Sequence, residues 1–373
     1  MKFKTVKKLT AMVLTCALGA VLLAGCGNNE NRAEEGNTSK TSADAETAAP
    51  AEVAAQTFTF TTTYSETEYA GDIIKELKSQ LETLSDGKIT LDVYYGGTMA
   101  GTGEELSFVG DGGVDMSLIG QSQYTDVLSL LNFPSQVTTG YADSVKLMDD
   151  IAFNNEATKD LVQAEIEKSN VTMLGSMPGG TNAFITKEEY TSLDEIKSLK
   201  LGIGMNQSAM EALGFNVVAV MPWDYYDSLS RAIVDAGYMS VTGLVSMSMH
   251  EVTPYFLADG TYTAGNFVTM NLDKWNSLDE ATQEILKQAV ANTQEYACTR
   301  AAELDEQAAE TISSAGGKLN TVNEEDAATI QSTFFTYGVS DARAYAEAAG
   351  TSDAMETVLQ EVAKVVGLEV PAK

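Results

Sequence analysis

The side chains that usually carry catalysis or metal binding are scarce in this chain of 373 residues. It has one histidine, His250, which rules out a His-rich metal site and disfavours a Ser-His-Asp triad. A pair of carboxylates could act as acid and base, but Glu104 and Glu105 are adjacent on an expected helix and point in different directions. The sequence contains no phosphate-binding glycine loop and no EF-hand loop. These patterns predict a protein that is not an enzyme and needs neither a metal nor a cofactor.

Among the three cysteines, Cys26 has the most informative position. It follows an apolar run, residues 9–24, and a basic head with four lysines. This is the layout of a signal peptide over residues 1–25, and the apolar run is short for a membrane span of about 20 residues. The letters LAGC that end at Cys26 resemble the lipobox of bacterial lipoproteins, which implies cleavage before Cys26 and acylation of its sulfur. Two acyl chains suffice for stable membrane anchoring. The alternative is a plain secretory signal with an incidental cysteine.

The segment after Cys26 predicts a tether. Residues 26–56 are rich in Ala, Glu, Thr, Asn and Ser and have almost no large apolar side chain, so they cannot bury enough surface to order themselves. We therefore expect a domain held outside the cell, near the membrane. Cys16 would leave with the signal peptide, so Cys298 would stay as a packed thiol with no disulfide partner. The formal net charge of −30, which becomes about −34 without the four lysines, excludes nucleic acid as a partner.

The remaining residues, from 57 onward, predict two α/β units. Strands and helices alternate in the first unit, where we expect strands over 57–63, 88–95 and 114–119 and helices over 65–84 and 102–109. The alternation restarts in a second unit, with strands over 171–174, 183–186, 200–204 and 217–220 and helices from 208 and over 224–234. A long helix over 277–314, with a capping box of Ser277 and Glu280, would exceed about 50 Å and could brace two lobes. Such folds bind ligands in the cleft beyond the strand ends.

The folded region, nearly end to end, resembles the substrate-binding proteins of tripartite ATP-independent periplasmic (TRAP) transporters, the DctP-like group. The resemblance rests on short pieces that come in the family's order: GKI and VYYGG within 87–97, EEL and GGVDM within 104–116, LNFP at 131–134, SLDEIKSLK at 192–200, YDSL and VDAG within 226–237, and WNSL at 275–278.

The resemblance implies a bilobed α/β fold of the periplasmic-binding-protein (Venus flytrap) type, in which two lobes close around a solute. Lobe I would comprise residues 57–178 with about 269–310, and lobe II residues 179–268 with about 311–373. It further implies delivery of the solute to two TRAP membrane subunits, driven by an ion gradient. We expect a monomer.

Departures from the family pattern bear on the solute. Members that bind carboxylates usually carry an arginine that forks onto the acid. Gly202 stands at that position here, and Asn182 stands where a second arginine is common. A polar contact of the family falls near Tyr238 and Met239. The usual anion clamp is thus missing, which favours a neutral sugar or nucleoside-like ring over an organic acid.

The resemblance also suggests which side chains contact the solute. Trp223 stands where the family often places an aromatic ring over the ligand, and Tyr64, Tyr225, Tyr238 and Asn182 are nearby in the pattern. The structural alternative is that these rings simply pack between the lobes. Glu66 and Glu68 would instead favour a cationic solute.

Three other functions stay open. A receptor of the same shape could serve an ATP-driven importer, or could hand its closed form to a sensor. An extracellular enzyme is a further class, which requires a cluster of catalytic residues that the sequence does not display.

Overall fold

A computed structural model describes residues 53–204 and 206–373. The signal peptide, Cys26 and the tether up to residue 52 lie outside the described residues. The strands of the described part are β1 (Gln56–Thr61), β2 (Ile89–Tyr94), β3 (Met116–Gly120), β4 (Val171–Thr186), β5 (Lys200–Ile203), β6 (Asn216–Ala219), β7 (Ala236–Ser240), β8 (Tyr255–Asn271) and β9 (Lys318–Thr321). The helices are α1 (Tyr69–Leu84), α2 (Glu105–Gly110), α3 (Tyr141–Asp149), α4 (Lys159–Ile166), α5 (Leu193–Ile196), α6 (Gln207–Ala212), α7 (Tyr225–Ser230), α8 (Val241–Ser246), α9 (Leu272–Ser277), α10 (Glu280–Ser314), α11 (Glu324–Ala349) and α12 (Ser352–Val366).

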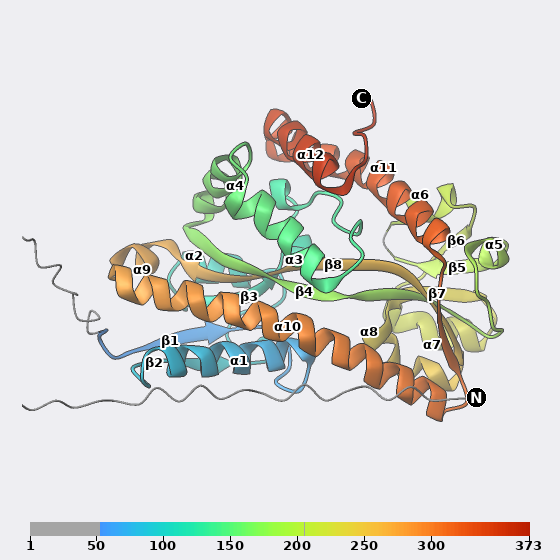
Figure 1. The fold of residues 1–373 in the computed structure, drawn as a ribbon, viewed down its shortest axis with the longest axis horizontal. Coiled ribbons are helices and arrows are strands. Elements are labelled where there is room, and N and C mark those ends of the chain that lie inside the picture. Colours follow the sequence, from blue (N-terminus) through green and yellow to red (C-terminus); the bar gives the residue numbers. More distant parts are fainter. Residues whose placement is uncertain (1–52, 205) are drawn as a thin grey trace, which may run out of the picture. The chain divides into compact units, whose positions relative to one another are not determined.

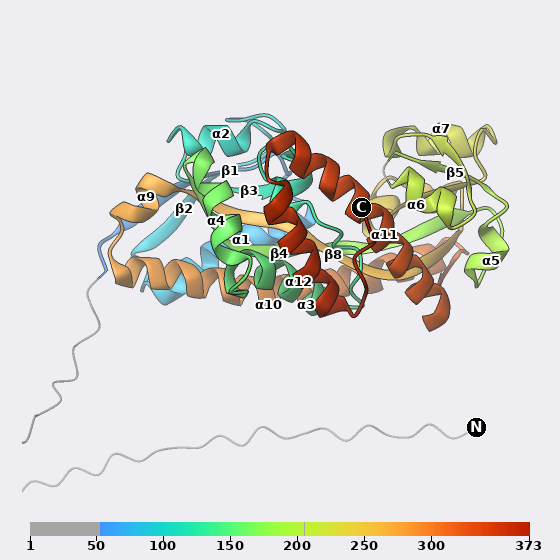
Figure 2. The same ribbon diagram turned by 90° about the horizontal axis from the view of Figure 1, so that it is seen from above.

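These strands form one mixed sheet in the order β2-β1-β3-β8-β4-β7-β5-β6, with β9 beside β8. The pairs β1–β2, β1–β3, β5–β6 and β5–β7 are parallel, as the alternation of strands and helices predicts. The contacts of β8 with β3 and β4, and of β4 with β7, are antiparallel. We call the part around β1, β2 and β3 the first half and the part around β5, β6 and β7 the second half. Figure 2 shows the two halves at opposite ends of the long strands β4 and β8.

Strand β4 corrects the predicted break between two short strands. It runs from Val171 to Thr186 without interruption and pairs with β8 along its length. The register shifts at Met177/Pro178 and again between Pro178 and Ala183. Proline lacks an N–H for the sheet and is tolerated where the ladder is irregular, so β4 continues through Pro178.

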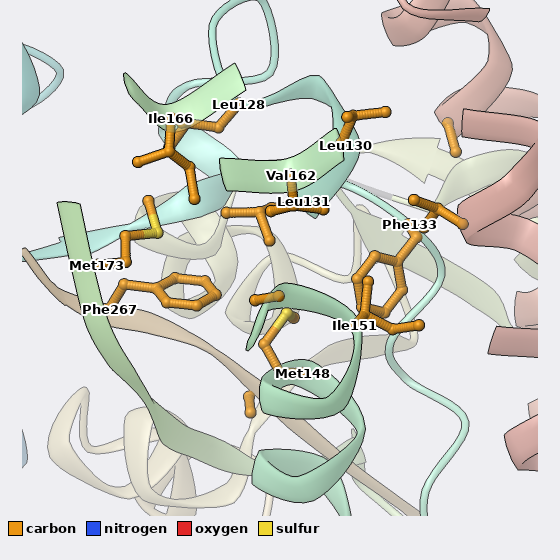
Figure 3. Packing of buried hydrophobic residues seen from close by; sticks show 14 of the residues in the cluster. Leu128, Leu130, Leu131, Phe133, Met148, Ile151, Val162, Ile166, Met173 and Phe267 are labelled. Carbon is orange, nitrogen blue, oxygen red and sulfur yellow. The ribbon is translucent and has the colours of Figure 1, made fainter. Parts of the chain in front are cut away.

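Four apolar clusters cover the sheet, one on each face of each half. In the first half, Phe267 packs in one cluster and its neighbour Val268 in another, because successive strand residues point to opposite faces. In the second half, Leu257 packs in one cluster and its neighbour Phe256 in the other. Figure 3 shows one first-half cluster, in which Phe267 lies near Met148.

Two long helices each contribute to both halves. Helix α10 supplies Leu286 and Val290 to a first-half cluster and Ile312 to a second-half cluster. Its 35 residues correspond to about 52 Å, so the expected brace is present. Helix α11 supplies Phe334 to the second half and Phe335 to the first. Figure 1 shows α10 on one face of the sheet and α12 on the other.

The C-terminal helices pack differently from the expected lobe assignment. Helix α12 buries Met355, Leu359 and Val362 in a first-half cluster, although the sequence suggested lobe II for residues 311–373.

The expected capping box at the start of α10 is also corrected. Asp279 caps this helix by accepting a 2.8 Å hydrogen bond from the N–H of Thr282. Ser277 instead belongs to α9. Within the described residues, no helix has the length and apolar character needed to cross a membrane.

Candidate functional site

A cavity of about 620 Å³ lies between segments of the two halves. The first half lines it with residues that follow β3 and with the loop before α3, and the second half with residues at the ends of β5 and β7. Strand β8 and helix α11 complete the wall with Asn266 and Asp341 among other residues. The parallel strands of both halves therefore place the cavity beyond their carboxyl ends, as expected for this type of sheet.

Five of the six expected ligand contacts line this cavity: Tyr64, Asn182, Trp223, Tyr225 and Tyr238. Trp223 is 70% exposed, whereas Tyr225 is fully buried. The adjacent Tyr226 is exposed and does not line the cavity, because successive helix residues point in different directions.

Gly202 is the exception, because it does not line the cavity. A Cβ atom at this position would lie 3.2 Å from Cγ2 of Val234 and 3.3 Å from Cβ of Val220. Both valines belong to a buried apolar cluster of the second half. The position of the missing arginine is thus filled by close packing between β5 and its neighbours.

The cavity wall carries amides in place of cations. Seven of its residues have amide side chains: Gln121, Gln123, Asn132, Gln136, Asn182, Asn206 and Asn266. Asp341 is the one charged residue in the described wall, and neither lysine nor arginine lines it. Arg231 is 73% exposed in its side chain and lies 3.9 Å from Asp227, so it faces solvent. Most of these amides could not be predicted as ligand contacts, because the sequences of β8 and of the loops after β3 carry no pattern that marks such a contact.

Tyr64 and Asn266 form one polar group of the wall. The hydroxyl of Tyr64 donates a 3.0 Å hydrogen bond to Oδ1 of Asn266, from β8. Burial raises the pKa of Tyr64, and the nearby carboxylates of Glu105 and Glu68 raise it further. Tyr64 is therefore a neutral hydrogen-bonding group at neutral pH.

Tyr238 forms a second polar group at the floor of the cavity. Its hydroxyl donates to Oδ2 of Asp259, whose other oxygen accepts from the N–H and the hydroxyl of Thr261 at 2.8 and 2.9 Å. Burial raises the pKa of Asp259 to about 6. The hydroxyl of Tyr225 donates to the backbone oxygen of Tyr238 at 2.9 Å, and burial raises the pKa of Tyr225 to about 12. These bonds fix the rings of the floor in place.

The described residues show no other reactive centre. They contain no group of His, Cys, Asp and Glu side chains that could hold a metal ion. Burial raises the pKa of the Cys298 thiol, and the nearby Glu295 raises it further. A thiol with a raised pKa is a poor nucleophile. The arrangement of the cavity therefore suits binding through neutral hydrogen bonds and aromatic contact.

Comparison with known protein families identifies the family of this chain. The model of the family described as "bacterial extracellular solute-binding protein, family 7" (DctP) matches residues 60–338. The chain belongs to this family. The DctP match covers both halves of the sheet and all but the last part of the cavity wall, where Asp341 and Tyr345 lie beyond it.

Individual DctP-like relatives are distant. A solute-binding protein of Roseobacter denitrificans is 24% identical over 226 residues, which are 58% of this chain and 66% of that protein. A monocarboxylate 2-oxoacid-binding periplasmic protein of Nostoc sp. is 28% identical over 135 residues, or 34% of this chain and 37% of its own length. This chain thus spans just under two thirds of the first relative and much less of the second.

The solved structure of a TRAP periplasmic solute-binding protein from Rhodobacter sphaeroides, in an open form without ligand, shares the fold. Its TM-score is 0.72 at 14% identity, and the superposition covers 83% of this chain and 99% of that one. The bilobed α/β fold expected from the sequence is thereby confirmed.

Proposed function

We propose that this protein is an extracytoplasmic receptor that binds a small solute and delivers it to the membrane subunits of a TRAP transporter. The observation that carries the proposal is a cavity of about 620 Å³ with walls from both halves of a DctP-family fold. Pockets for small molecules commonly enclose about 300–1,000 Å³. A solute that contacts both halves favours the closed arrangement, because it makes more contacts there than with either half alone. The protein thus acts by binding, without chemistry on the solute.

We further propose that the solute is neutral. No lysine or arginine lines the described cavity wall, and the two positions of the usual arginines hold Gly202 and Asn182. A carboxylate in this cavity would lose water without gaining a cationic partner, which costs several kcal/mol. The Nostoc relative takes its name from monocarboxylates, so this chain would differ from it in substrate class. Amide and tyrosine side chains instead suit the hydroxyl and ring groups of a sugar or nucleoside.

A ligand screen by thermal shift tests both statements. The purified protein would be heated with organic acids, sugars, nucleosides and amines in turn. A solute at one hundred times its dissociation constant stabilises a protein by about 2.7 kcal/mol, which raises the melting temperature measurably. We expect a neutral compound to give the largest shift. A shift only with acids would contradict the proposed solute class, and no shift with any compound would contradict the receptor.

The membrane anchor is a separate proposal, supported by the sequence around Cys26. Acylation at this cysteine would hold the receptor at the outer face of the cell membrane through the tether. Cells grown with labelled palmitate should incorporate label into the wild type and not into Cys26→Ala. Equal labelling of both proteins would contradict it.

Transport assays separate TRAP delivery from the alternatives. Membrane vesicles with the TRAP subunits should take up the solute only when this protein and an ion gradient are both present. Uptake that requires ATP hydrolysis instead would favour an ATP-driven importer.

A further inference from the structure

We propose that the space beside Gly120 is a subsite for a hydroxyl group of the solute, so that the solute is a polyhydroxylated neutral molecule. This inference rests on the proposed receptor function and narrows it to one chemical class. It starts from a point in the cavity wall where a side chain is missing and three polar atoms converge.

Gly120 ends strand β3 and lines the cavity. A Cβ atom built on it would lie 3.5 Å from Oδ1 of Asn266, 3.7 Å from Nε2 of Gln123 and 3.8 Å from the hydroxyl oxygen of Tyr64. All three of these residues also line the cavity. A solute atom cannot sit at the Cβ point itself, which lies one bond length from Cα, but the missing side chain leaves the space next to it open, and three polar groups border that space.

The existing hydrogen bond decides which atoms remain available. The Tyr64 hydroxyl donates its proton to Oδ1 of Asn266 at 3.0 Å. The phenolic oxygen and Oδ1 each retain capacity to accept, while Nε2 of Gln123 has protons to donate. The open position thus faces both acceptors and a donor.

A hydroxyl group matches this combination, because it donates one hydrogen bond and accepts others. It would donate to Oδ1 of Asn266 or to the Tyr64 oxygen and accept from Gln123. A carboxylate or phosphate oxygen can only accept and would meet two acceptors. An ammonium group can only donate, so the Nε2 donor of Gln123 would have no acceptor.

The backbone at Gly120 does not require glycine. Its φ of −92° and ψ of 118° lie in the extended region that any residue adopts. The nearest atoms, at 3.5 Å and beyond, leave room for a methyl group. Gly120→Ala should therefore fold normally and fill the subsite. Gly140→Ala is the matched control, because Gly140 has an extended φ of −167°, lies outside the cavity, and has only Oδ2 of Asp143 near a Cβ, at 3.6 Å.

Titration calorimetry on the full-length purified protein tests the subsite. The probes are pentoses, hexoses and sugar alcohols, their matched sugar acids and amino sugars, and simple carboxylates and amines without hydroxyl groups. We expect a neutral polyol or sugar to bind most tightly. Gly120→Ala should weaken that compound about tenfold or more, and Tyr64→Phe several-fold, since a bound hydroxyl loses its partners. Gly140→Ala should bind as the wild type does, and both glycine variants should keep the wild-type melting temperature without solute.

Deoxy analogues of the tightest compound give a second measurement. Removal of the one hydroxyl that occupies the subsite should weaken binding to the wild type about tenfold and cause no further loss in Gly120→Ala. Losses that are the same in both proteins at every hydroxyl would overturn the subsite, as would unchanged affinity of Gly120→Ala. A carboxylate or amine that binds most tightly would overturn the solute class while leaving the receptor intact. A panel in which nothing binds would contradict the receptor itself and the subsite with it.

Discussion

The amide of Asn206 donates a 2.9 Å hydrogen bond to Oε1 of Gln136, and this bond joins the two sides of the cavity. Gln136 precedes α3 in the first half, and Asn206 precedes α6 in the second. Any motion that separates the halves must break this contact. It therefore opposes opening of the cavity in the structure described.

We expect Asn206→Ala to release the solute about two- to tenfold faster than the wild type. A neutral hydrogen bond contributes about 0.5–1.5 kcal/mol, and its loss lowers the barrier to opening by up to that amount. Stopped-flow fluorescence after dilution of the complex measures the dissociation rate. Gln207→Ala, which alters the next residue outside the cavity wall, should release solute at the wild-type rate. An unchanged rate in Asn206→Ala would show that the bond does not restrain opening.

Trp223 should report solute binding by its fluorescence. The residue is 70% exposed and lines the cavity, so a solute and closure around it would remove water from the indole. The chain has two tryptophans, and Trp275→Phe leaves Trp223 as the single emitter. We expect its emission to shift to shorter wavelength and its quenching by acrylamide to fall at saturating solute. Emission that stays constant while calorimetry detects binding would place the solute away from Trp223.

Asp305 should make stability depend on pH. The hydroxyl of Tyr141 donates to its Oδ2, while its Oδ1 is buried without a partner. Burial raises the pKa of Asp305 to about 6, above the ordinary value near 3.9. The folded state thus binds this proton more tightly than the unfolded state. The favourable contribution is complete below pH ~4 and is lost as the pH rises through about 6.

Asp305→Asn should therefore be more stable than the wild type at pH 8, by about 1–3 kcal/mol, and lose this advantage near pH ~4. Urea unfolding at both pH values measures the difference. Glu306→Gln, at the exposed next position of α10, should show no such pH-dependent gain. A gain of equal size at both pH values would assign the effect to packing and not to the charge.

The start of α10 gives a test of helix capping. Asp279→Ala removes the oxygen that accepts from the N–H of Thr282, and an N-cap of this kind contributes about 1 kcal/mol. Ser277→Ala should change the free energy of unfolding by less than about 0.5 kcal/mol, because Ser277 lies one helix earlier and only bonds back to Lys274. Chemical denaturation of both variants decides the matter. A larger loss in Ser277→Ala would restore the cap expected from the sequence.

Local patterns in the sequence were sufficient to place most of the α/β elements. The strand at residues 88–95 and the helix after it follow from alternation and from apolar spacing, which depend on neighbours in the chain. Strand β4 could not be predicted as one piece, because the motif at Pro178 reads as a break unless β8 is known to pair across it. The cap of α10 was misplaced by two residues for a similar reason: both Ser277 and Asp279 are good N-caps, and tertiary packing selects between them.

The residues of the cavity wall likewise fall into those that the sequence could predict and those that it could not. Tyr64, Asn182 and Trp223 could be proposed because they stand at or near positions where the resemblance implies ligand contacts, and all three line the cavity. Asn266 and Gln123 belong to no such piece, and they meet Tyr64 only because β3 and β8 are adjacent in the sheet. Gly202 was expected at the ligand from the family's arginine, but a Cβ atom at this position would contact Val220 and Val234, and one sequence does not show this packing.

The unbroken course of β4 and β8 has a consequence for anyone who wishes to build a reporter from this protein. Both strands supply main-chain partners to each half, so dividing the gene between the halves would give two fragments that each lack part of their sheet. A fluorescent protein inserted near Pro178 would cut the same ladder. The turn at Gly350, between α11 and α12, interrupts no strand and is the better junction for a fused module.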